Sequence, residues 1–121
     1  MFWIGIAIGG GCGALARAWI SLTLLPLSSF PVATLVVNTL GSFAIGCCWV
    51  WFNRYGASST VTGLVMTGFL GGFTTFSTFS LESLQLLQQE HYGVAILYVA
   101  LSLLLCLFAV GAGVILAKWV I

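Results

Sequence analysis

The stretch GFLGGFTTFSTFS, residues 68–80, combines features that a simple membrane anchor does not need. It contains four phenylalanines, three glycines and five hydroxyl side chains, and it carries no charge. The adjacent glycines Gly71 and Gly72 disfavour a regular helix, yet the segment lies inside a long hydrophobic run. The sequence therefore predicts a membrane helix that is broken near its middle, with rings and hydroxyls following the break.

The composition of the whole chain indicates a membrane protein. Of its 121 residues, 61% are hydrophobic and only 4% are charged, whereas a soluble domain carries about 25% charged residues. In water such a chain would expose large apolar patches and aggregate. A lipid bilayer is therefore the expected surrounding.

Four apolar runs are long enough to span a bilayer, which takes about 20 residues per helix. They cover about 2–25, 32–52, 60–87 and 92–120. Turn-forming and polar residues separate them: Pro26 and Pro31 with Ser28 and Ser29, then NRYGASS from Asn53, then QQEHYG from Gln88. We expect one all-α domain, residues 1–121, with four transmembrane helices. The first run has no basic start and carries Arg17, so we expect a retained helix, not a signal peptide.

The few charged residues only weakly determine how the chain is oriented in the membrane. With four helices, Arg54 and Lys118 lie on the side of both termini, and Arg17 lies nearer the opposite side. Membrane orientation follows the lysine and arginine excess, and two against one is barely an excess. The chain is thus a candidate for insertion both ways, and two antiparallel copies would form the inverted-repeat architecture of many transporters.

Pairs of glycines four residues apart favour close helix packing. They occur at Gly9 and Gly13 and again at Gly68 and Gly72. The spacing is compatible with contacts between two subunits and equally with packing inside one subunit.

Further polar residues are predicted at membrane depth. Asn38 lies in the first third of the second run, where its amide needs an interhelical hydrogen bond or a watery cavity. In the fourth run Tyr98, Ser102 and Cys106 fall at i, i+4 and i+8 and form one stripe, although a serine can also bond back to its own helix. The four cysteines show no metal-binding spacing, which indicates small buried hydrophobes.

The residues after the predicted break would suit a small anion. Phe76 and Phe79 are three apart and share a helix face, and an aromatic ring presents a positive edge. Thr75, Ser77 and Thr78 place hydroxyl donors around them. Ring faces would instead suit a cation, and a plain aromatic packing stripe is the structural alternative.

These residues resemble the CrcB/Fluc family of fluoride channels. GFLGGFTTFSTFS is similar to the family's third-helix signature, GGGCGALAR ending at Arg17 to its glycine-rich first helix, and VNTLGSFAIG to its second-helix asparagine motif. The spacing to Tyr98 and Ser102 also fits, and the resemblance covers essentially all 121 residues. Cys106 departs from it, because a serine is expected there, and a thiol is a weaker donor than a hydroxyl.

The resemblance implies an antiparallel, dual-topology homodimer in a bacterial inner or plasma membrane. It would export fluoride passively from the cytoplasm and so reduce fluoride toxicity. Asn38 would be a fluoride ligand, and Phe76 and Phe79 would be the pore phenylalanines. The other candidates for the fluoride pathway are Thr75, Ser77, Thr78, Ser102 and Tyr98.

The same resemblance places Arg17 near a pore vestibule. It also implies a structural sodium ion at the dimer centre, held by the backbone carbonyls of Gly71 and Thr74. The expected partners are fluoride, the lipid bilayer and a second copy of the chain, with no nucleic acid and no enzymatic activity.

Two other functions remain open at the level of sequence. A proton-coupled multidrug exporter of this size needs a membrane-embedded carboxylate, and Glu82 lies late in the third run, nearer the loop. A structural subunit without a pathway would leave the predicted break and Asn38 unexplained.

Overall fold

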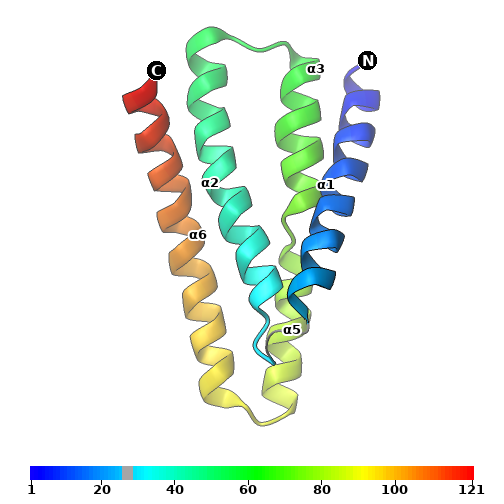
Figure 1. Ribbon diagram of the computed structural model, residues 1–121, viewed down its shortest axis with the longest axis vertical. Helices are drawn as coiled ribbons and strands as arrows, with labels where there is room; N and C mark the ends of the chain where they lie inside the picture. Colours follow the sequence, from blue (N-terminus) through cyan, green and yellow to red (C-terminus); the bar gives the residue numbers. More distant parts are fainter. Residues whose placement is uncertain (26–28) are drawn as a thin grey trace.

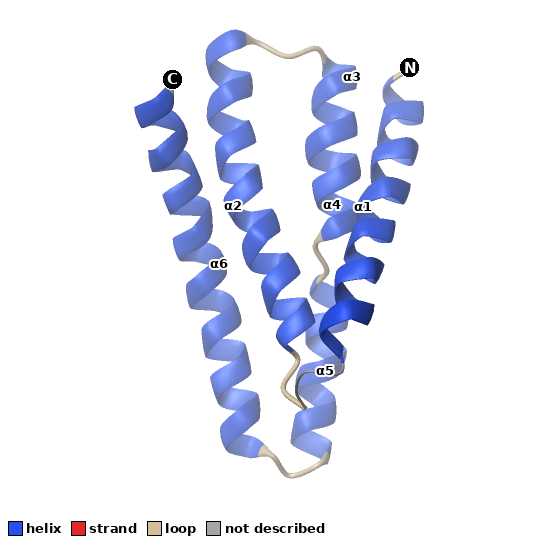
Figure 2. Ribbon diagram, viewed as in Figure 1, coloured by secondary structure: helices blue, strands red, loops and turns tan. Residues whose placement is uncertain are grey.

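The chain folds into long helices that run alongside one another (Figures 1 and 2). The computed structural model describes residues 1–25 and 29–121, so the turn predicted at Pro26 and Ser28 lies outside the described residues. Four segments of this part are long and apolar enough to cross a membrane: Phe2–Leu24, Val32–Tyr55, Ser59–Gln88 and Tyr92–Val120. The predicted all-α chain with four membrane-spanning helices is confirmed.

Three of the four spans are continuous helices, namely α1 (Phe2–Leu24), α2 (Val32–Tyr55) and α6 (Tyr92–Val120). The third span comprises α3 (Ser59–Thr62), the π-helix η2 (Gly63–Leu70), α4 (Gly71–Phe73) and α5 (Phe76–Gln88). Helix α2 continues three residues beyond the end expected at Phe52, and the Asn53 side chain in this last turn donates to the Trp49 carbonyl, 2.8 Å away. Gly56 then ends the helix with a positive φ of 73°, which suits glycine.

Both chain termini lie at the same end of the molecule as the α2–α3 connection (Figure 1). The α5–α6 turn lies at the opposite end. Arg54 and Lys118 are in the last turns of α2 and α6, so both charges lie toward the end with the termini. Arg17 is in the later half of α1, nearer the other end, as the sequence predicts.

The third span is interrupted near its middle, as predicted, but the glycines do not make the break. Gly71 and Gly72 are helical and belong to α4. The backbone becomes extended at Thr74, with φ −83° and ψ 158°, and at Thr75, with φ −152° and ψ 117°. Assigning the break to the glycine pair was wrong, because Gly72 is needed for contact with α1: a Cβ on it would collide with the Gly10 carbonyl oxygen.

The glycine pairs bring α1 and the third span together within one chain. A Cβ on Gly9 would collide with the Leu64 carbonyl oxygen, and one on Gly13 with the Phe69 carbonyl oxygen. On the facing segment, a Cβ on Gly68 would lie 2.8 Å from the Ile6 carbonyl oxygen. Of the two uses that the spacing allows, these pairs therefore serve packing inside the subunit, where small residues let backbones approach.

Replacing Gly13 with alanine is expected to lower the stability of the folded chain in detergent by about 1–3 kcal/mol, the usual cost of overpacking. The added methyl would meet backbone atoms of Phe69 and Phe73, which cannot rotate away. Thermal unfolding followed by circular dichroism measures the change. Gly11→Ala is the matched control on the same helix, since no atom lies within 4 Å of its added Cβ. Equal unfolding midpoints for the two variants would contradict the packing argument.

The turn between α5 and α6 is closed by a backbone motif that ends helices. The Glu90 amide donates to the Leu87 carbonyl at 3.0 Å, and the His91 amide donates to the Leu86 carbonyl at 2.9 Å. Glu90 has a left-handed φ of 60°. These two bonds form a Schellman motif, so the QQEHYG segment reverses the chain and directs α6 back along the bundle.

Candidate functional site

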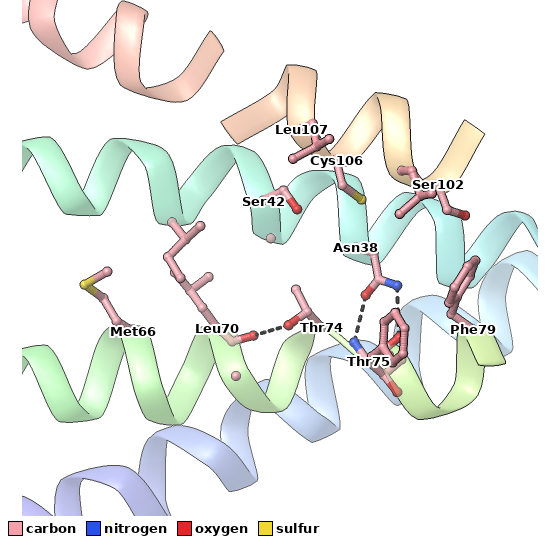
Figure 3. A pocket seen from close by; sticks show the side chains of 15 residues that line it. Asn38, Ser42, Met66, Leu70, Thr74, Thr75, Phe79, Ser102, Cys106 and Leu107 are labelled. Carbon is pink, nitrogen blue, oxygen red and sulfur yellow. Dashed lines mark hydrogen bonds between the residues drawn. The ribbon is translucent and has the colours of Figure 1, made fainter. Parts of the chain in front are cut away.

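Asn38 on α2 binds both backbone polar groups of Thr75 at the break. Its side-chain nitrogen donates to the Thr75 carbonyl oxygen at 3.0 Å, and the Thr75 amide donates to its side-chain oxygen at 2.7 Å (Figure 3). Non-helical backbone at membrane depth requires such partners. Asn38 is therefore the clamp that makes the extended conformation of Thr75 tolerable.

The clamp changes the hydrogen bonding of α4. In an unbroken helix the Thr75 amide would donate to the carbonyl of Gly71, four residues earlier. Here that amide is taken by Asn38, so the Gly71 carbonyl loses its usual donor. The Thr74 side chain donates to the Leu70 carbonyl at 2.9 Å, which holds the last turn before the break.

The hydroxyls after the break form one cluster at the start of α5. The Thr75 hydroxyl oxygen accepts from the Thr78 amide at 3.2 Å and thus caps the helix. It also lies 3.1 Å from the Thr78 hydroxyl and 3.3 Å from the Ser77 hydroxyl. At least one role of these side chains is therefore to start the helix that carries the two phenylalanines.

A cleft of about 430 Å³ opens beside the break. It collects most of the site residues that the sequence predicts: Asn38, Gly71, Thr74, Thr75, Phe76, Phe79 and Ser102. Asn38, Thr74, Thr75, Phe79 and Ser102 are labelled in Figure 3. Ser42 of α2 and Cys106 of α6 also line it, and the rest of its wall is apolar. Segments from α2, the third span and α6 thus converge on one neutral cavity.

The two predicted pore phenylalanines have different surroundings. Their ring centroids are 5.4 Å apart with an interplanar angle of 47°. Phe79 is 8% exposed and its ring centroid lies 5.3 Å from that of Tyr98, whereas Phe76 is 75% exposed. Phe79 is anchored in the core, and Phe76 stands at the open side of the cleft.

Four of the predicted residues do not line this cleft. Ser77 and Thr78 lie in the helix cap, and Arg17 lies on α1. Tyr98 is fully buried behind Phe79. The stripe predicted from Tyr98 to Cys106 is therefore divided, with only Ser102 and Cys106 at the cleft.

Glu82 ties three helices together, a role that the sequence interpretation missed. One of its carboxylate oxygens accepts from the Tyr98 hydroxyl at 2.6 Å, and the other accepts from the Thr34 hydroxyl at 2.9 Å. A signal was present in the spacing, because Glu82 follows Phe79 by three residues and Thr34 precedes Asn38 by four. Each residue therefore shares a helix face with a recognised site residue.

Ser102 has an unusual hydrogen-bonding state. Its side chain is 7% exposed, and its hydroxyl has no hydrogen-bond partner among the described residues. Buried hydroxyls without a partner are uncommon and call for an explanation. Since Ser102 lines the cleft, a ligand or water there is the natural partner.

The fold and the cleft together define a class of protein. It is a small multi-pass membrane protein whose discontinuous third span meets a neutral cleft at membrane depth. Residues 4–114 match the family model described as CrcB-like protein, Camphor Resistance (CrcB). The chain belongs to the CrcB family.

The similarity to known proteins extends over most of the chain. A protein of Saccharophagus degradans is 43% identical over 120 residues, covering 98% of this chain and 90% of the relative. One of Hahella chejuensis is 40% identical over 121 residues, covering 96% of this chain and 94% of the relative. One of Salmonella arizonae is 45% identical over 103 residues, covering 84% and 81% respectively. All three are named fluoride-specific ion channel FluC.

Proposed function

We propose that this chain is a fluoride-selective channel that lets fluoride leave the cytoplasm passively across a bacterial plasma membrane and so reduces its toxicity. The observation that carries the proposal is the break in the third span, clamped by Asn38 beside a neutral cleft. The relatives that share at least 40% identity with this chain over nearly its full length are named for the same activity.

The lining of the cleft suits transient binding of a strongly hydrated anion. A permeation pathway must replace the ion's hydration without holding the ion too tightly. The second side-chain proton of the Asn38 amide, the Ser102 hydroxyl and the positive ring edge of Phe76 are neutral donors. Among the described residues, no lysine or arginine lines the cleft, so no fixed positive charge there would trap fluoride.

Efflux from proteoliposomes tests the function directly. Purified protein is reconstituted, and the release of fluoride, chloride and a cationic dye is measured in parallel. The proposal requires fluoride efflux with little chloride or dye efflux. Dye efflux driven by a proton gradient would favour an exporter that uses Glu82, and no efflux of any solute would favour a structural subunit.

We propose further that the functional unit is an antiparallel homodimer. One subunit offers only a thin bundle, and Phe76 stands 75% exposed at the edge of an open, largely apolar cleft. A second copy would cover this cleft and complete a protected pathway. The small difference in charge between the two ends of the chain supports insertion both ways.

A membrane-impermeant reagent directed at a C-terminal tag tests the dimer geometry. In sealed vesicles we expect about half of the tags to be labelled, because the weak charge bias lets both orientations form. Labelling after the vesicles are opened gives the total. Labelling of all tags or of none in sealed vesicles would contradict the antiparallel dimer.

We also propose that a structural sodium ion binds at the centre of this dimer. The Gly71 carbonyl has lost its helical donor to Asn38, and Thr74 is extended at the end of α4. Backbone carbonyls of broken helices coordinate sodium in transporters. The described residues contain no cluster of His, Cys, Asp or Glu suited to a metal, so carbonyl oxygens are the fitting donors. The bound ion would supply a positive charge near the anion pathway.

Substitutions on the two sides of the break separate backbone from side-chain roles. Thr74→Val keeps the backbone and is expected to retain sodium-dependent stabilisation of the dimer. Gly71→Pro removes an amide that donates to the Gly68 carbonyl, and the proline ring clashes with the preceding turn. This variant should therefore lose the stabilisation by sodium. Thermal unfolding in sodium and in a large organic cation measures both. Loss of the sodium effect in Thr74→Val alone would contradict the carbonyl site.

A further inference from the structure

We infer that Cys106 is a thiol-modification site inside the cleft, where small soft electrophiles close the anion pathway. This inference rests on the proposed channel function. Cys106 lines the cleft and is partly buried, so its side chain is neither free in lipid nor sealed in the core. Figure 3 shows its sulfur pointing toward the side of the cleft that holds Asn38.

Ser102 provides an independent reason to expect a ligand at this place. It lies one helical turn before Cys106 on the same face of α6. Its hydroxyl is buried and has no partner among the described residues, and it lines the same cleft. An ion that uses the Ser102 hydroxyl must pass close to the Cys106 sulfur. A group attached to that sulfur would therefore stand in the path of the ion.

The other three cysteines are placed differently. The Cys47 thiol donates to the Gly113 carbonyl at 3.4 Å, in the contact between α2 and α6. Cys12 is exposed on α1, and none of Cys12, Cys47 and Cys48 lines the cleft. Modification of the exposed Cys12 should leave the cleft open, which makes this residue the internal control.

Methyl methanethiosulfonate is a suitable probe because it adds only a methylthio group. The Cys106 thiol gives its proton to water, and the thiolate attacks the divalent sulfur of the reagent. A disulfide bond forms, the sulfur–sulfur bond of the reagent breaks, and methanesulfinate leaves with its electron pair. The methylthio group then fills space beside Ser102 and removes the thiol proton from the cleft.

The test combines labelling and flux on the same reconstituted protein. Fluoride efflux is measured before and after the reagent for the unchanged protein, Cys106→Ser and Cys12→Ser, each against its own starting rate. Peptide mass spectrometry identifies the labelled cysteines. We expect loss of most efflux in the unchanged protein and in Cys12→Ser, with Cys106 labelled, and no loss in Cys106→Ser.

Three results would overturn the inference, and none is confused with failure of the channel function. The first is absence of label on Cys106, and the second is label on Cys106 with efflux unchanged. The third is loss of efflux in Cys106→Ser as well, which would assign the block to another cysteine. Absence of fluoride efflux before any reagent is added would instead reject the proposed function itself.

Discussion

Replacing Asn38 with alanine is expected to reduce fluoride efflux by more than about tenfold, the change that corresponds to 1.4 kcal/mol. The substitution leaves the Thr75 amide and carbonyl without the two bonds that Asn38 supplies. Each buried backbone group without a partner costs about 1–3 kcal/mol. The chain can avoid this cost only by leaving the extended conformation at Thr75, which moves Phe76 and Phe79.

The aspartate variant of Asn38 distinguishes geometry from charge. A carboxylate can still accept from the Thr75 amide but cannot donate to the Thr75 carbonyl. If ionised it would also repel an anion in the cleft. We therefore expect Asn38→Asp to conduct even less fluoride than Asn38→Ala, as measured by proteoliposome efflux normalised to the amount of folded protein.

Asn53 is the matched control because it lies on the same helix and has the same side chain. It is exposed, and its side-chain amide donates to the Trp49 carbonyl within α2. Asn53→Ala is expected to leave fluoride efflux unchanged. If Asn38→Ala conducted as well as Asn53→Ala, the clamp at the break would not be needed for conduction.

The interruption of the third span shows what the sequence can and cannot predict. The mixture of glycine, threonine and phenylalanine after residue 67 correctly predicts a discontinuous membrane helix. Its location at Thr74 and Thr75 depends on Asn38, which is distant in sequence but adjacent in space. Gly72 instead serves a contact with Gly10. Local propensity thus predicts a weak point, and a tertiary hydrogen bond selects the residue at which the helix opens.

For the candidate site, too, the sequence predicts the residues and the fold supplies their partners. Residue type and depth in the membrane were enough to predict that Asn38 and Ser102 need partners, because an amide and a hydroxyl are disfavoured in apolar surroundings without a hydrogen bond. The partners of these groups required the fold. Glu82 lies near a loop in the sequence, yet the packing of α5 against both α2 and α6 brings Thr34 and Tyr98 to its two oxygens.

Replacing Phe76 with isoleucine is expected to lower fluoride efflux by about tenfold or more while the protein stays folded. The change keeps an apolar side chain but removes the ring and its positive edge, which is the group proposed to face the anion. Phe76 is 75% exposed in one subunit, so the core of that subunit loses little. Efflux and elution from a size-exclusion column measure conduction and assembly separately.

Phe79→Ile should also reduce efflux strongly, but it is the less decisive variant. Phe79 is buried against Tyr98, so the substitution also leaves a cavity in the core. A loss of efflux would then combine packing with recognition. Phe76→Ile is the clearer test of the ring edge, because Phe76 takes no part in the contact between Phe79 and Tyr98.

Phe108→Ile is the control that makes the Phe76 result interpretable. Phe108 lies on α6, is likewise 75% exposed and does not line the cleft. The same chemical change there should leave efflux and elution unaltered, because the ring meets no anion. A loss of efflux in Phe76→Ile alone, with both variants assembled alike, would assign the effect to the ring at the cleft. Full efflux in both variants would mean that Phe76 only packs, and the pathway would then have to rest on Asn38 and the hydroxyl groups.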